Sequence, residues 1–149
     1  MTRYAALLAM VAGAATAITG SLMAWVQTGS RSRNSYDVFD IVERLGFAPD
    51  GIEAHALRWW PTMPLVVIAA VVAAWWGFRR SGAVVGIIGG IFAGGIGTTV
   101  AAASAARDIE PRGGAVVTAV GGWLLVAASI LELAVGRRSS CASAASGLT

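Results

Sequence analysis

Three acidic side chains stand close together in the polar segment that follows the first apolar run: Asp37, Asp40 and Glu43. Two carboxylates that flank a scissile bond can act as general acid and base in glycoside or peptide hydrolysis. At this spacing on a helix, carboxylates more often form a solvated face with local ion pairs. The sequence also has no serine in a nucleophile elbow, no phosphate-binding loop and no metalloprotease spacing. We expect no enzyme, and keep action on a lipid-linked substrate through these carboxylates as a weaker alternative.

His55, the only histidine, lies in the same segment. A metal or haem site generally needs more than one such ligand, and no second histidine or cysteine lies nearby. We therefore expect His55 to be a loop or interface residue, and we expect no metal and no cofactor. A pH-sensing role is an alternative for which the sequence offers no partner.

Glu132 is the only acidic or basic residue within the long apolar runs of the chain. Proton- or ion-coupled transporters normally keep several charged groups at membrane depth. Because Glu132 lies about one turn from the end of its run, we predict that it reaches the membrane interface or an arginine of a neighbouring segment. A functional contact inside the membrane is the alternative.

The composition indicates an integral membrane protein. Of 149 residues, 56% are hydrophobic and only 13% are charged, and the mean hydropathy is +0.70. These values exclude an ordinary soluble domain and a disordered chain, and a single cysteine excludes a disulfide scaffold. The net charge of +3 comes from arginines spread along the whole chain, so we expect no nucleic-acid partner and take the lipid bilayer as the first partner.

Four apolar runs are long enough to cross about 30 Å of hydrocarbon, which takes about 20 residues. They cover residues 4–26, 60–78, 81–106 and 115–135. We predict an all-α integral membrane protein, a four-transmembrane-helix bundle with a short amphipathic helix or two in its long first loop.

A single membrane domain is predicted over residues 1–138, followed by a disordered tail over residues 139–149. The first run could instead be a secretory signal, because Ala15-Thr16-Ala17 offers a cleavage pattern. Since that run is longer than the core of a signal peptide, we prefer a spanning helix.

The arginines suggest an orientation. On one side of the membrane they abut helix ends in very short segments, whereas on the other they are diluted among acidic residues. We predict a multi-pass plasma-membrane protein with both termini cytoplasmic and the loop 27–58 extracytoplasmic. Five tryptophans are expected to be interfacial anchors: Trp25, Trp59, Trp60, Trp75 and Trp76.

The loop 27–58 is predicted to be organised. Asn34 or Ser35 can cap a helix whose apolar residues include Phe39, while Asp40 and Arg44 have the favourable i,i+4 spacing of an ion pair. A second helix is expected to begin at Asp50 with a capping box. We regard the loop as the recognition surface, and its candidate residues are Tyr36, Asp37, Phe39, Asp40, Arg44 and His55.

A stripe of small residues follows the third run at four-residue spacing. Its members are Gly82, Gly86, Gly90, Gly94 and Thr98, with Ala102 and Ala106 beyond them. The first run has a milder version in Ala5, Ala9, Gly13, Ala17 and Ser21. Serial small residues let helix backbones approach closely in a bilayer. We predict that the stripe packs on the first or fourth helix, with assembly of several chains as the alternative.

Several segments of the first half resemble a group of small, largely uncharacterised four-span membrane proteins of actinobacteria. The segments are Gly20-Ser21-Leu22-Met23-Ala24-Trp25-Val26, Ser35-Tyr36-Asp37-Val38-Phe39-Asp40, Arg44-Leu45-Gly46 and Arg58-Trp59-Trp60-Pro61. The resemblance implies a plasma-membrane protein with an outer loop. It implies no reaction, cofactor or catalytic residue.

The leading hypothesis is a non-enzymatic accessory or assembly protein that packs or docks through its glycine stripe and recognises a membrane-protein partner with its loop. The motivation is an organised outer segment on a bundle almost without charge at membrane depth. The principal rival is a homo-oligomeric channel or small-molecule transporter in which glycine-lined helices surround a pathway.

Overall fold

The computed structural model describes residues 2–28, 31–44, 58–105 and 113–146. The elements, in chain order, are α1 (Thr2–Leu22), β1 (Ala24–Thr28), β2 (Arg31–Asn34), α2 (Ser35–Arg44), the 3₁₀ helix η1 (Trp60–Thr62), α4 (Met63–Trp75), α5 (Arg79–Ala105) and α6 (Gly113–Ser146).

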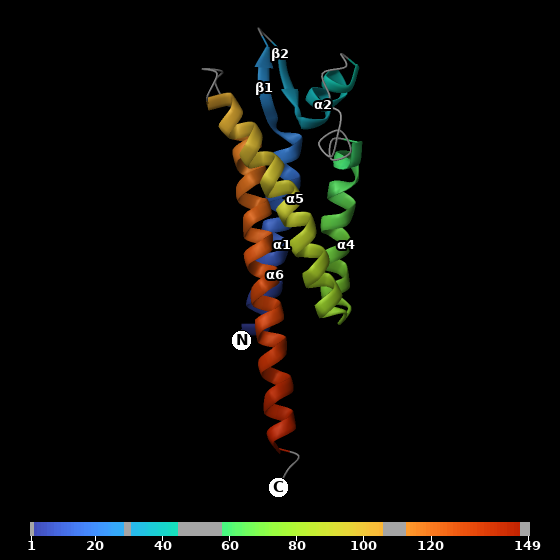
Figure 1. Ribbon diagram of the computed structural model, residues 1–149, viewed down its shortest axis with the longest axis vertical. Coiled ribbons are helices and arrows are strands. Elements are labelled where there is room, and N and C mark those ends of the chain that lie inside the picture. Colours follow the sequence, from blue (N-terminus) through green and yellow to red (C-terminus); the bar gives the residue numbers. More distant parts are fainter. Residues whose placement is uncertain (1, 29–30, 45–57, 106–112, 147–149) are drawn as a thin grey trace.

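Helix α6 is the centre of the molecule. It packs against both α1 and α5, and α4 packs against α5 and also contacts α1 (Figure 1). The strands and α2 lie together at one end of the helices, which we call the hairpin end. The turn from α4 into α5 lies at the opposite end, which we call the Arg79 end.

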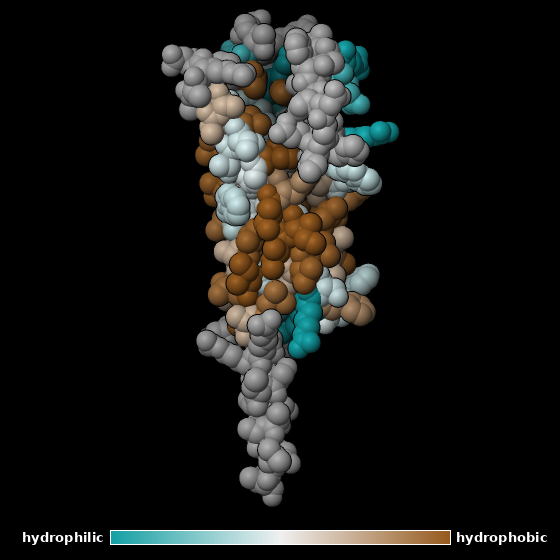
Figure 2. Space-filling view, in the orientation of Figure 1, coloured by the Kyte–Doolittle hydropathy of each residue, from teal (hydrophilic) through white to brown (hydrophobic). Residues whose placement is uncertain are grey.

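Three helices are long and apolar enough to cross a membrane: Tyr4–Leu22, Arg79–Ser104 and Gly113–Val135. Figure 2 shows apolar side chains over the middle of the molecule and hydrophilic ones towards its two ends. Length and composition therefore both support an α-helical membrane protein.

The second apolar run, predicted over 60–78, forms a shorter apolar helical segment over Trp60–Trp75. At the helical rise this segment measures about 24 Å, less than the roughly 30 Å of a hydrocarbon core. It ends before Gly77, whose φ of 99° turns the chain into α5.

The first run, predicted to be helical over 4–26, ends as a helix at Leu22. The residues after it form β1, which pairs antiparallel with β2 between Ala24 and Asn34 and on to Thr28 and Arg31. Pairing with β2 makes these residues a strand, and the strand preference of Trp25, Val26 and Thr28 favours that pairing. The all-α prediction therefore missed one β-hairpin.

The C-terminal residues also differ from the sequence prediction. Helix α6 continues to Ser146, well into the tail that was predicted to be disordered over 139–149. Gly136 follows the apolar run directly, but a single glycine inside a helix costs only about 1 kcal/mol, and residues 137–146 contain neither glycine nor proline.

Helices α5 and α6 meet at glycines of both. A Cβ on Gly90 would lie 2.7 Å from the Gly122 carbonyl oxygen and 2.8 Å from Val126 Cγ2, and one on Gly94 would lie 3.2 Å from the Trp123 ring. A side chain at Gly90 would force the α6 backbone to move, and one at Gly94 would require Trp123 to give way by a few tenths of an ångström. The middle of the predicted stripe, Gly90 and Gly94, is thus used for packing inside the chain.

Helices α1 and α6 approach just as closely. A Cβ on Gly13 would lie 2.7 Å from the backbone nitrogen of Leu125, and one on Gly121 would meet the backbone of Ala17. Ser21, the last predicted member of the α1 stripe, is fully buried. The consecutive glycines Gly121 and Gly122, which point about 100° apart on the helix, therefore receive two different neighbours, α1 and α5.

The four-residue spacing did not hold over either whole helix. Gly82 packs against α4 rather than α6, since its Cβ would lie 2.6 Å from the backbone nitrogen of Ala74. Ala5 and Ala9 are exposed, contrary to the prediction for the α1 stripe, and Thr98 is exposed although its hydroxyl contacts Trp123 of α6. Four residues turn a helix by about 400°, so a strict repeat of four rotates by about 40° per step and leaves the contact face.

Gly90→Leu is expected to lower the free energy of unfolding by about 3 kcal/mol, because the side chain would collide with the α6 backbone. Gly95→Leu is the matched control, since a Cβ there meets nothing within 4 Å. Its effect should stay within about 0.5 kcal/mol. Thermal unfolding in detergent measures both, and equal losses would show that the α5–α6 contact is not the one described.

Candidate interaction surface at the hairpin end

Four aromatic side chains from four elements pack together beneath the hairpin. We call them the aromatic cluster: Trp25 of β1, Phe39 of α2, Trp60 of η1 and Phe92 of α5. The rings of Trp25, Phe39 and Trp60 meet edge to face, with centroids 5.2 to 5.8 Å apart. Such ring pairs contribute about 0.5–1.5 kcal/mol each beyond the area they bury, so the cluster fixes α2 on the bundle.

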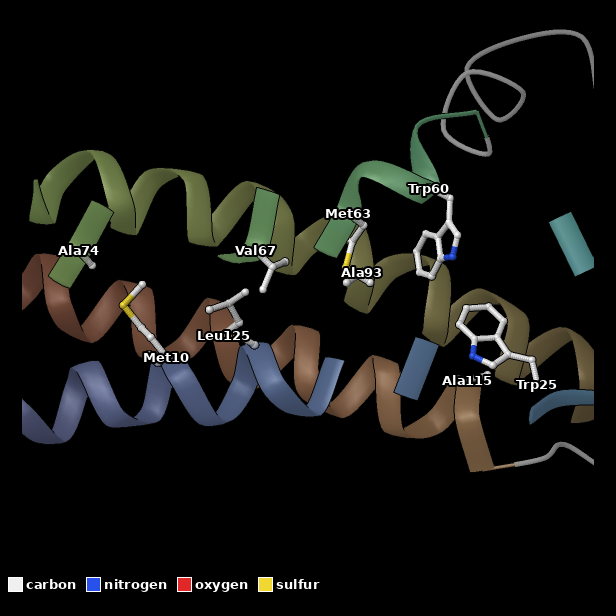
Figure 3. Close-up of a cluster of buried hydrophobic side chains, with 11 residues drawn as sticks. Met10, Trp25, Trp60, Met63, Val67, Ala74, Ala93, Ala115 and Leu125 are labelled. Atoms are coloured by element: carbon white, nitrogen blue, oxygen red, sulfur yellow. The ribbon is translucent and has the colours of Figure 1, made fainter. Parts of the chain in front are cut away.

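A buried serine connects the cluster to α1. The Ser35 hydroxyl donates to the Ser21 carbonyl oxygen at 2.7 Å and accepts from Trp60 Nε1 at 3.0 Å. Trp25 Nε1 donates to the Gly20 carbonyl oxygen at 2.9 Å. Carbonyl groups in the last turn of α1, where the regular helical hydrogen bonds run out, thus accept from side chains of the hairpin end. Figure 3 shows Trp25 and Trp60 side by side at this end of the buried core.

Helix α2 begins with a side-chain cap and presents charge outward. The Asn34 side-chain oxygen accepts from the backbone N–H of Asp37 at 3.0 Å, as the sequence predicted for Asn34. Asp40 and Arg44 form an exposed ion pair of 2.9 Å at i,i+4 spacing. The helix therefore has a polar face toward solvent and an aromatic face toward the bundle.

The predicted recognition residues separate into two groups. Phe39 and Tyr36 are partly buried and pack on the core, so they hold α2 in place. Asp37, Asp40 and Arg44 are exposed and form the outer face. His55 and the second helix predicted from Asp50 lie outside the described residues.

Two of the five tryptophans predicted as interfacial anchors have a different place. Trp25 and Trp60 are 1% and 0% exposed, because their indole N–H groups and rings are both used inside the hairpin end. Trp59, Trp75 and Trp76 are exposed, as membrane anchors require. The sequence could not separate the two groups, since a tryptophan at a helix end satisfies both patterns.

One tryptophan contact was not predicted from the sequence. Trp123 of α6 is half exposed, and its Nε1 donates to the Thr98 hydroxyl of α5 at 3.1 Å. Thr98 is therefore engaged with α6 through its hydroxyl, from the edge of the contact.

The carboxylates of α2, Asp37, Asp40 and Glu43, are all exposed. Asp40 is paired with Arg44 in the open, and no three histidine, cysteine, aspartate or glutamate side chains come together among the described residues. The part of the chain that the structure describes thus offers a charged surface here, with no enclosed acid–base pair.

A second polar group lies at the Arg79 end. Glu132 of α6 is 2% exposed, and Arg79 Nε lies 3.2 Å from its Oε1. This separation is that of an ion pair, although neither carboxylate oxygen is hydrogen-bonded within the described residues. The sequence predicted an arginine of a neighbouring segment as one partner for Glu132, and Arg79 is that residue.

No family model matches the chain, and neither a curated protein nor a solved structure matches it.

Ser35→Ala is expected to lower the free energy of unfolding by about 2 kcal/mol, because the buried Trp60 N–H loses its acceptor. The exposed Ser32→Ala on β2 is the control and should change stability by less than about 0.5 kcal/mol. Thermal unfolding followed by tryptophan fluorescence measures both. A Ser35 variant as stable as the control would contradict the role of this hydroxyl.

Arg79→Gln is expected to cost about 3 kcal/mol, because it leaves the Glu132 carboxylate buried and unpaired. We take the lower end of the usual range since the Arg79 side chain keeps 29% of its exposure. The double variant Arg79→Gln/Glu132→Gln should recover most of this loss. If the double variant loses as much stability as the single variants Arg79→Gln and Glu132→Gln lose together, the two side chains are not coupled.

Proposed function

We propose that this chain is a non-enzymatic integral membrane accessory or assembly protein whose hairpin end recognises a partner membrane protein. The observation that carries the proposal is the build of α2. Its aromatic face is locked to the bundle by the aromatic cluster and Ser35, while Asp37, Asp40 and Arg44 point outward. A preordered charged surface loses little conformational entropy when it binds.

The charged face of α2 suits selection of a partner more than tight adhesion. Its ion pair of Asp40 and Arg44 is exposed, and such pairs contribute about 0–1 kcal/mol to stability. These charges are therefore dispensable for folding. Complementary charges on a partner would use them for orientation and for fast association.

The packing of the glycine stripe supports this proposal over the rival channel. Gly90 and Gly94 are covered by α6 of the same chain, which removes them from the lining of a pathway between chains. A pore or transporter would also need polar groups along a route. Between the two ends, the core is built mainly of apolar side chains such as Met10, Val67 and Leu125 (Figure 3), with Ser129 as a buried polar residue.

We further propose that the chain lies in the plasma membrane with α4 as a fourth, short span. Exposed Trp59 and Trp75 lie at the two ends of its helical segment, where interfacial anchors belong. The bilayer can accommodate this short helix by becoming thinner around it. In this arrangement the hairpin end is extracytoplasmic, and both termini are cytoplasmic.

The double variant Asp40→Asn/Arg44→Gln is expected to lose a co-purifying membrane protein while the chain stays folded, because it leaves the net charge unchanged and touches only exposed atoms. Purification in mild detergent from native membranes, with identification of what is retained, is the measurement. Arg80→Gln is the control, with one exposed charge removed at the other end.

A ring of identical subunits that carries solutes across liposome membranes would contradict the accessory role and favour the channel. Retention of the same partner by the double variant and by the control would show that the outer face of α2 is not the recognition surface.

A further inference from the structure

We propose that the Arg79 end binds the phosphate of an anionic phospholipid through Arg79 and Arg80. The inference goes beyond the proposed recognition role, because it concerns the other end of the molecule and needs no protein partner. It rests on two adjacent guanidinium groups, their one buried counter-charge, and the aromatic turn that precedes them.

The two arginines are unequally neutralised. Arg79 is held by the buried Glu132 through its Nε, which leaves its two terminal nitrogens without another ion pair in the described part of the chain. Arg80 is exposed, and no described residue forms a hydrogen bond or ion pair with it. One of the two positive charges is thus paired with a carboxylate, and the other lies at the surface.

The partial positive charge at the start of α5 adds to this surplus positive charge. The first turn of α5 contains no acidic residue, although the partial positive charge of a helix start favours anions there. An outside anion would offset both the helix and the two side chains. Phosphate oxygens match the planar donors of a guanidinium group, which can contact them at two points.

The depth of the arginines in the membrane selects a lipid as the source of that phosphate. Trp75, Trp76 and Phe78 are exposed around the turn at Gly77, and exposed indoles collect at the level of lipid headgroups. The arginines follow this turn directly, so they lie where lipid phosphates are concentrated. The surplus charge favours a headgroup with net negative charge over a zwitterionic one.

The test is binding of phosphatidylglycerol and phosphatidylcholine to the full chain, measured by native mass spectrometry after titration in detergent. We expect phosphatidylglycerol to be retained preferentially. Arg80→Gln should weaken its binding roughly fivefold, which corresponds to about 1 kcal/mol for a basic residue near an anionic surface. Phosphatidylcholine binding should not change.

Arg58→Gln is the matched control. Arg58 is also an exposed arginine beside an exposed tryptophan, Trp59, but it lies at the hairpin end and has no second arginine next to it. The same variant chemistry there should leave phosphatidylglycerol binding unchanged. Thermal unfolding in lipid-free detergent should be alike for both variants, which separates a loss of binding from a loss of folding.

The contribution of Arg79 is measured in a background that does not unfold the bundle. The double variant Arg79→Gln/Glu132→Gln is compared with the single variant Glu132→Gln. In this background the loss of Arg79 leaves no unpaired carboxylate buried. A further loss of phosphatidylglycerol binding is expected.

Three results would overturn the proposal. One is equal retention of the two lipids by the unaltered chain. Another is an equal loss in the Arg80 and Arg58 variants, which would indicate general attraction by net charge. The third is displacement of phosphatidylglycerol by inorganic phosphate at equal concentration, because the ligand would then be free phosphate and not a lipid.

Discussion

The close approach of both α1 and α5 to α6 is the constraint on which the rest of the molecule depends. It needs Gly121 toward α1 and Gly122 toward α5, since a Cβ at either position would meet a neighbouring backbone. In a bilayer, apolar side chains gain nothing by leaving lipid for protein, so van der Waals contact at short range is the main source of helix association. Two consecutive glycines therefore decide where α1 and α5 pack on α6 and how far apart the three axes are.

The order at the hairpin end follows from this packing. Once α1 lies against α6, Gly20 is pressed to the backbone of Thr118 and the last turn of α1 is fixed in place. The carbonyl oxygens of Gly20 and Ser21 then accept from Trp25 and Ser35. Ser35 in turn accepts from Trp60, which ties the entry to α4 to the same point. One helix end thus carries the hairpin, α2 and η1, and none of these short elements could be held by its own hydrogen bonds alone.

Composition and run length were sufficient to predict the membrane class and the three long apolar helices, because both depend only on the amount of apolar surface. The cap of α2 by Asn34 and the pair of Asp40 and Arg44 were predictable for a different reason. Both contacts join residues only three or four positions apart in the sequence. The hairpin was not, since Trp25 and Val26 continue an apolar run and only pairing with β2 makes them a strand. Trp60 was assigned to the interface although it is buried, because its burial depends on residues far away in the sequence, Trp25, Ser35 and Phe39. Sequence spacing also predicted the glycine stripe of α5 but not its neighbours, since Gly82 packs against α4 while Gly90 packs against α6.

The two ends of the bundle place their charges in different ways, and this difference bears on function. At the hairpin end the buried polar contacts are neutral, and the charges lie outside on α2. At the Arg79 end a charge is carried inside, because Glu132 is buried and depends on Arg79 across the helix contact. A buried ion pair contributes less to stability than an apolar contact would, but it penalises any sliding of α5 along α6 that separates the two charges. Glycine contacts alone tolerate such sliding, since small residues recur along both helices. The ion pair therefore fixes the position of α5 along α6, and with it the height of the turn that carries Trp75 and Trp76 relative to the opposite end that carries α2.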